Sequence, residues 1–123
     1  MMSFEDAGAV LDELADSLPE AFFRKLNGGV LLSRETCTRD DMPGNLLTMG
    51  VYRHDYTGRS IEIYYGSFAA LYARKSDGFW REELRRVLMH EFTHHLESLG
   101  GERVLERQDE AELARYLEEW GEG

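Results

Sequence analysis

The sequence has little of what several classes of protein require. Cysteine occurs once, at Cys37, so the chain cannot form an internal disulfide, which is typical of a reducing compartment. No apolar run approaches the length of a membrane-spanning helix. The acidic stretch 1–6 also lacks the basic region and apolar run of a secretory signal. We therefore expect a cytoplasmic protein with no membrane partner.

Basic residues are also scarce. The chain has 14 Lys and Arg against 24 Asp and Glu, which gives a net charge of −10. This balance argues against nucleic acids and anionic membrane surfaces as partners, because both carry negative charge. What is present is enough for a folded core: 42% of the 123 residues are hydrophobic. A chain of this length predicts a single domain over residues 1–123.

The order of apolar segments predicts an α+β fold. Apolar residues at helical spacing, with Ser3 as a cap and Pro19 as a helix start, predict helices at 4–18, 20–26, 68–72, 79–99 and 110–120. Short apolar or alternating runs predict strands at 30–32, 46–52 and 61–65. Between the strands, 33–45 is predicted to be a loop and 53–60 a hairpin connection.

Three of the four histidines lie within six residues, in the run His90-Glu91-Phe92-Thr93-His94-His95. Residues four apart share one face of a helix, so His90 and His94 can bind one metal ion together. Glu91 can then face a water molecule in the remaining position of the metal. The alternative is a solvated helix turn that carries histidines without function.

The helix around this motif supports the metal interpretation. Residues 79–99 contain no proline and no glycine, and their apolar residues recur at spacings of three and four: Trp80, Leu84, Val87, Leu88, Phe92, Leu96 and Leu99. Rotation of about 100° per residue places Glu91 and His94 on a flank of the apolar face, with His90 just beyond. His95 falls within the apolar face, so we interpret it as a core residue and not as a ligand.

A catalytic zinc site normally has three protein ligands and one open position. The third ligand should lie downstream, and the candidate carboxylates are Glu97, Glu102, Glu106, Asp109, Glu110 and Glu112. We rank Asp109 first, because it opens the predicted last helix and could be aimed at the ion, although it could equally be a plain helix cap. Glu102 ranks second, because it follows the turn signal Gly100-Gly101 and could fold back.

The sequence resembles the small bacterial zincin-like metallopeptidases, a minimal family related to the gluzincins. The resemblance rests on a first helix ending near Leu18-Pro19, on strands at 30–32 and 61–65, and on the doubled histidine His94-His95. It implies a compact α+β domain, with a small sheet of about three strands packed on the motif helix and helices at both ends. It also implies zinc bound by His90 and His94, with Glu91 as general base.

One departure concerns the third ligand. The family often continues with Phe-Gly and an acidic ligand soon afterwards, whereas Leu96 and Glu97 follow here and a longer connection precedes Asp109. The hypothesis is therefore a zinc-dependent hydrolase, a metallopeptidase acting on a peptide or protein substrate. Tyr64, Tyr65 and Tyr116 are candidate oxyanion donors, and 61–65 could pair with a peptide if it forms an exposed edge strand.

Two other functions are consistent with the sequence. A non-catalytic adaptor domain would keep the motif helix as a scaffold and would use its acidic surface to bind a basic partner. A metal sensor or store is the third possibility, although two histidines alone support it poorly. Neither the substrate nor the oligomeric state can be read from the sequence.

Overall fold

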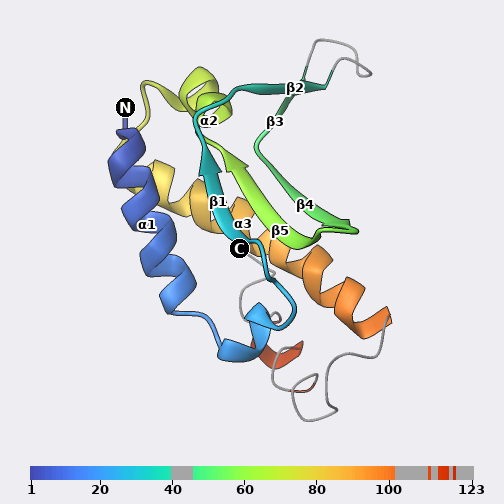
Figure 1. Ribbon diagram of the computed structural model, residues 1–123. Helices are drawn as coiled ribbons and strands as arrows, with labels where there is room; N and C mark the ends of the chain where they lie inside the picture. The colour runs from blue at the N-terminus through green and yellow to red at the C-terminus, as the bar shows by residue number, and fades with distance from the viewer. Residues whose placement is uncertain (40–45, 102–110, 112–113, 117, 119–123) are drawn as a thin grey trace.

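The structure is a computed structural model that describes residues 1–39, 46–101, 111, 114–116 and 118. The helical elements of the described chain are α1 (Phe4–Asp16), the 3-10 helix η1 (Glu20–Phe23), α2 (Tyr65–Tyr72) and α3 (Asp77–Gly101). The strands are β1 (Gly29–Ser33), β2 (Cys37–Arg39), β3 (Leu46–Thr48), β4 (Gly50–Asp55) and β5 (Gly58–Tyr64). Figure 1 shows this arrangement.

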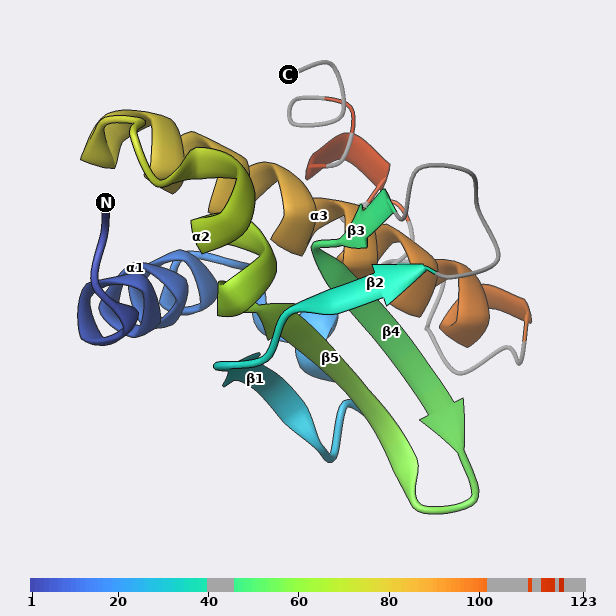
Figure 2. The same cartoon turned by 90° about the horizontal axis from the view of Figure 1, so that it is seen from above.

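Two layers make up the fold. Strands β1, β5 and β4 form one sheet in that order, and α1 and α3 cover one face of it (Figures 1 and 2). The core lies between these layers, where Ile61 and Ile63 of β5 and Phe92 of α3 are completely buried. The confirmed prediction is therefore an α+β fold whose small three-stranded sheet packs on the motif helix.

Strand β5 lies in the centre of the sheet, and β4 lies at its edge. Strand β1 pairs with β5 in parallel and β4 pairs with it antiparallel. The amide of Tyr64 donates to the carbonyl of Met49 at 2.9 Å, which fixes the phase of the antiparallel ladder. Because hydrogen-bonding direction alternates along a strand, residues 51 and 53 face β5, whereas Gly50, Tyr52 and His54 turn their backbone groups to the free edge.

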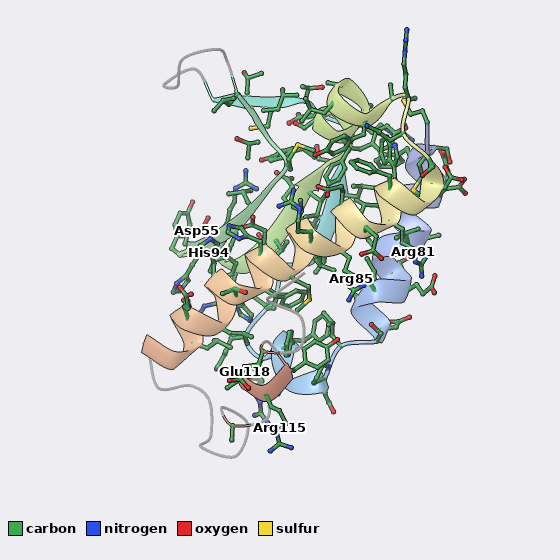
Figure 3. All side chains as sticks on the ribbon, turned by 180° about the vertical axis from the view of Figure 1, so that it is seen from behind. Asp55, Arg81, Arg85, His94, Arg115 and Glu118 are labelled. Carbon is green, nitrogen blue, oxygen red and sulfur yellow. The ribbon has the colours of Figure 1, made fainter. Side chains whose placement is uncertain are left out.

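Helix α3 follows its sequence pattern closely. Its buried residues recur at helical spacing and are Trp80, Leu84, Val87, Leu88, Glu91, Phe92, His95, Leu96 and Leu99. Farther from the motif, Arg81 lies on the side of α3 toward α1 and pairs with Glu13 at 2.6 Å (Figure 3). At the start of α1 the Ser3 hydroxyl accepts the amide of Asp6 at 3.0 Å, as a capping serine should. The Ser3 cap thus sets where α1 begins, and the buried residues of α3 set which face of that helix packs on the core.

Two predictions about the strands were wrong. The predicted loop 33–45 contains β2, and the predicted strand 46–52 is two strands, since β3 turns away to pair with β2 while β4 pairs with β5. Glycine at position 50 permits the close approach of this segment to α3, because a side chain there would meet Val87. The predicted hairpin connection 53–60 does join two antiparallel strands, with a shorter turn between Asp55 and Gly58. The strand predicted at 61–65 is part of β5 in the centre of the sheet, so the condition of an exposed edge is not met there. Pairing is decided by distant segments, which local patterns do not reveal.

Other boundaries differ by smaller amounts. The second predicted helix is a short 3-10 helix that ends at Phe23, and α3 continues through Gly100 and Gly101. The last predicted helix, 110–120, falls largely outside the described residues, although those described within it, 111, 114–116 and 118, are helical. Within the described chain, no helix is long and apolar enough to span a membrane.

Candidate active site

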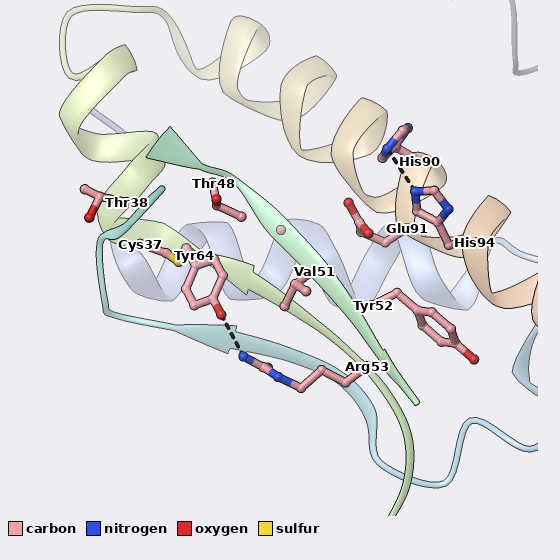
Figure 4. A pocket seen from close by; sticks show the side chains of 11 residues that line it. Cys37, Thr38, Thr48, Val51, Tyr52, Arg53, Tyr64, His90, Glu91 and His94 are labelled. Atoms are coloured by element: carbon pink, nitrogen blue, oxygen red, sulfur yellow. Dashed lines mark hydrogen bonds between the residues drawn. The ribbon is translucent and has the colours of Figure 1, made fainter. Parts of the chain in front are cut away.

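His90 and His94 lie one turn apart on the exposed flank of α3. Their Nε2 atoms are 3.2 Å apart, and the ring planes are nearly perpendicular, at 87° (Figure 4). Two imidazole nitrogens that share one tetrahedral zinc ion, each at about 2.0–2.1 Å, lie about 3.3–3.4 Å from each other. The spacing and the chemistry of this pair therefore fit a zinc ion.

Glu91 lies on the boundary between the core and the cleft. Only 7% of the residue is exposed, and its carboxylate interacts with the backbone amide of Tyr52. Burial raises the pKa of Glu91 above its ordinary value, while the charges of His90 and His94 and the Tyr52 amide oppose that shift. A carboxylate that is partly desolvated is a stronger base than a free one, and the net effect at Glu91 is in that direction.

His95 is fully buried, and both of its ring nitrogens have partners. Nε2 lies 2.9 Å from the carbonyl of Arg24, and Nδ1 lies 2.9 Å from the hydroxyl of Tyr52. Because a carbonyl can only accept, Nε2 carries the proton and Nδ1 accepts from Tyr52. Burial lowers the pKa of His95, which keeps the ring neutral. The prediction that His95 is a core residue is confirmed.

The histidine pair opens into a cleft of about 920 Å³ between α3, the edge of β4 and the β2–β3 pair. Figure 4 shows the Glu91 carboxylate pointing into this space, beside the two histidine rings. The cleft is lined by Cys37, Thr38, Thr48, Gly50, Val51, Tyr52, Arg53, Tyr64, His90, Glu91 and His94. Those from β2, β3 and β4 were not predicted, because no local pattern indicates β2 and because β3 and β4 resemble one continuous strand in the sequence.

The three tyrosines that were candidate oxyanion donors differ in position and in hydrogen-bond partner. Tyr64 lines the cleft, and its hydroxyl accepts from Arg53 Nη2 at 2.9 Å. The hydroxyl of Tyr65 donates to the carbonyl of Met2 at 2.6 Å, and Tyr116 packs edge-on against a buried phenylalanine of η1. Tyr64 therefore contributes shape and polarity to the cleft wall, and the other two tyrosines contribute to packing.

The two residues predicted as third ligand belong to the segment that follows α3. Asp109 and Glu102 both lie outside the described residues. Within the described ranges, no group of three or more His, Cys, Asp or Glu side chains is arranged to hold a metal ion. Among the described residues, the possible metal ligands at this site are therefore His90 and His94, with Glu91 beside them.

Comparison with known proteins relates the chain to one family and to solved structures. The family model described as zincin-like metallopeptidase matches residues 41–112, a range that includes β4, β5 and the whole of α3. A solved structure of a conserved hypothetical protein from T. thermophilus is similar with a TM-score of 0.70 and 30% sequence identity, over 81% of this chain and 99% of that one. No curated protein matches the sequence.

Proposed function

This chain belongs to the zincin-like metallopeptidase family, and on that premise we propose that it is a zinc-dependent hydrolase that cleaves peptide bonds. One observation carries the proposal: two imidazole nitrogens with the spacing of zinc ligands lie beside a carboxylate that points into the same cleft. His90 and His94 would hold the ion, and Asp109 or Glu102 would complete its protein ligands. Zinc bound there supplies a Lewis acid for the carbonyl and for water.

Glu91 acts as the general base in this proposal. Its carboxylate takes a proton from the attacking water and delivers it to the amine that leaves. The amide of Tyr52 holds one side of the carboxylate, so that the other side can face the cleft. The low exposure of Glu91 keeps competing solvent away from the group that moves the proton.

A peptide substrate fits the free edge of β4. Gly50 and His54 turn their backbone groups outward there, and an extended peptide can pair with such an edge by strand addition. The pairing would lay the peptide along the cleft, since Gly50 and Tyr52 line it together with His90. Residues 61–65 do not offer such an edge, because β5 has a neighbour on both sides.

The test compares wild type with Glu91→Gln, which keeps the shape of the side chain but cannot take the proton. Both proteins, loaded with zinc, are assayed on a library of unstructured peptides, and the zinc content of each is measured. We expect equal zinc contents and a fall in turnover of about 10²- to 10⁴-fold for the variant. Glu82→Gln, an exposed carboxylate on the same helix with 68% of its side chain accessible, is the matched control.

Two outcomes would reject the proposal. Equal turnover by wild type and Glu91→Gln would remove Glu91 from the mechanism. No cleavage by zinc-loaded wild type across the library would favour the acidic adaptor domain over the hydrolase.

A further inference from the structure

We propose that Tyr52 and His95 act together to position the carboxylate of Glu91, which makes the second member of the His94-His95 pair a positioning residue for the general base. The catalytic consequence of this inference rests on the proposed hydrolase function. The contacts themselves do not, so they can be tested in a protein without activity.

Two hydrogen bonds and one further interaction carry the inference. The imidazole of His95 donates from Nε2 to the carbonyl of Arg24 and accepts at Nδ1 from the hydroxyl of Tyr52, each at 2.9 Å. The backbone amide of the same tyrosine faces the free edge of β4, and its interaction with the carboxylate of Glu91 lowers the pKa of that group. Together these contacts link the residue that follows η1, the core face of α3, the edge strand β4 and the carboxylate in the cleft.

The position of Tyr52 explains why such a link matters. It lies on β4, which among the described strands pairs with β5 alone, so no second described strand holds its outer side at this point. Its backbone faces the free edge and reaches Glu91, while its side chain turns to the core, where its ring lies 5.2 Å from that of His95. The hydroxyl thus ties β4 to α3, and the amide that holds Glu91 belongs to the same residue.

His95 is suited to act as a fixed anchor. It is 0% exposed, and its ring lies edge-on to that of Phe92 at 6.3 Å. The carbonyl of Arg24 fixes which nitrogen carries the proton, so the other nitrogen can only accept. Because the His95 ring has one orientation and one tautomer, it holds the hydroxyl of Tyr52 in one place. An apolar residue of similar size would only fill the space.

Amide hydrogen exchange at residue 52 tests the link directly. An outward-facing amide on an edge strand exchanges rapidly unless a side chain accepts its hydrogen bond. In wild type we expect protection at residue 52, and Glu91→Ala gives the unprotected reference. Tyr52→Phe keeps the ring and the amide but removes the hydroxyl, and we expect it to reduce that protection at least about tenfold.

Tyr65→Phe is the matched control. It also removes a hydroxyl that donates inside the fold, to the carbonyl of Met2, and it should leave the exchange of residue 52 unchanged. His95→Gln breaks the same link from the other side, because it can still donate to the carbonyl of Arg24 but withdraws the Nδ1 acceptor. It should match Tyr52→Phe, and it provides the test if Tyr52→Phe does not fold.

Kinetics supply the second readout. At equal zinc content, Tyr52→Phe should lower kcat about tenfold with KM nearly unchanged, while Tyr65→Phe changes neither. Wild-type protection at residue 52 in both Tyr52→Phe and His95→Gln would overturn the inference. Lost protection with an unchanged kcat would overturn the positioning role. If wild type cleaves nothing, the proposed function fails, and the exchange experiment still decides whether the link holds Glu91.

Discussion

His94 and His95 are neighbours in the sequence and opposites in the structure. His94 is exposed, and its Nε2 lies 3.2 Å from that of His90, whereas His95 is 0% exposed and has a partner at each ring nitrogen. One step along a helix is a rotation of about 100°, and that rotation separates the two environments. The comparison teaches that His94 is available to bind a metal ion because a ring nitrogen faces the cleft, whereas the nitrogens of His95 are already occupied.

The same contrast divides the two sides of α3. The cleft side carries polar groups aimed at a space of about 920 Å³, and the core side carries large apolar side chains with His95 among them. Glu91 lies between the two sides, buried like a core residue but directed into the cleft. The predictions below test this division, from the largest expected effect to the smallest.

Removal of the cleft-facing histidine should abolish tight metal binding. We expect His94→Ala to lower the zinc affinity by about 10²- to 10³-fold, the share of one ligand in a typical site. The free energy of unfolding of the metal-free variant should lie within about 0.5 kcal/mol of the wild-type value, because His94 is exposed. Competition with a chromophoric chelator measures the affinity, and His54→Ala, at the exposed end of β4, is the control. Wild-type affinity in His94→Ala would break the comparison.

Removal of its buried neighbour should have the reverse effect. His95→Ala leaves a cavity and deprives Tyr52 and the carbonyl of Arg24 of their partner, so we expect a loss of about 3 kcal/mol in the free energy of unfolding. Zinc should still bind to the fraction that remains folded. Urea denaturation of the metal-free protein, followed by a zinc titration, measures both quantities. Unchanged stability with lost zinc would assign His95 to the metal site.

A third prediction concerns the residue that would complete the protein ligands of the proposed zinc site. Asp109→Ala should weaken zinc binding about 10- to 100-fold, less than His94→Ala, because a water oxygen can replace a carboxylate oxygen on zinc. Asp109 is expected to matter more than Glu102, since a residue at the start of a helix can face the preceding helix. The same chelator competition ranks the two variants, and a larger loss for Glu102→Ala would reverse their order.

The smallest effect is expected on the face of the sheet that points away from the core. Arg53 and Glu62 pair there at 2.8 Å, with 45% and 23% of their side chains exposed. Glu62→Gln should lower the free energy of unfolding at pH 7 by about 0.5–1 kcal/mol, as for a partly screened pair.

This effect should depend on pH in one direction. The hydrogen bond from Arg53 lowers the pKa of Glu62, so its contribution is complete above the ordinary glutamate pKa and is lost as the pH falls through the lowered value. Melting curves of wild type and Glu62→Gln should therefore converge in acid. A difference that grows as the pH falls would show that the pair does not act through the ionised carboxylate.

Sequence reasoning succeeded where the information is local. The stripe of Trp80, Leu84 and Leu88 predicted α3, and helical rotation alone predicted that His95 would be buried while His94 would not. These features depend on residues within one or two turns, which a periodic pattern reports directly.

The rest of the cleft depends on contacts between distant segments. Strand β2 exists because it pairs with β3, and Tyr52 reaches the site because β4 is an edge strand above α3. The hydroxyl of Tyr52 meets a ring 43 residues further along the chain, which no local pattern encodes. The tyrosine that contacts Glu91 was for this reason not among the predicted site residues.

X-ray absorption at the zinc edge tests the central claim most directly, because it counts the imidazole ligands of the bound ion. For protein loaded with one zinc ion per chain, the account predicts two imidazole nitrogens at about 2.0–2.1 Å, with oxygen atoms in the other positions. His95→Gln should leave that count at two, and His94→Ala should reduce it to one. Three imidazoles in wild type, or a count that falls with His95→Gln, would contradict the division between the two neighbouring histidines.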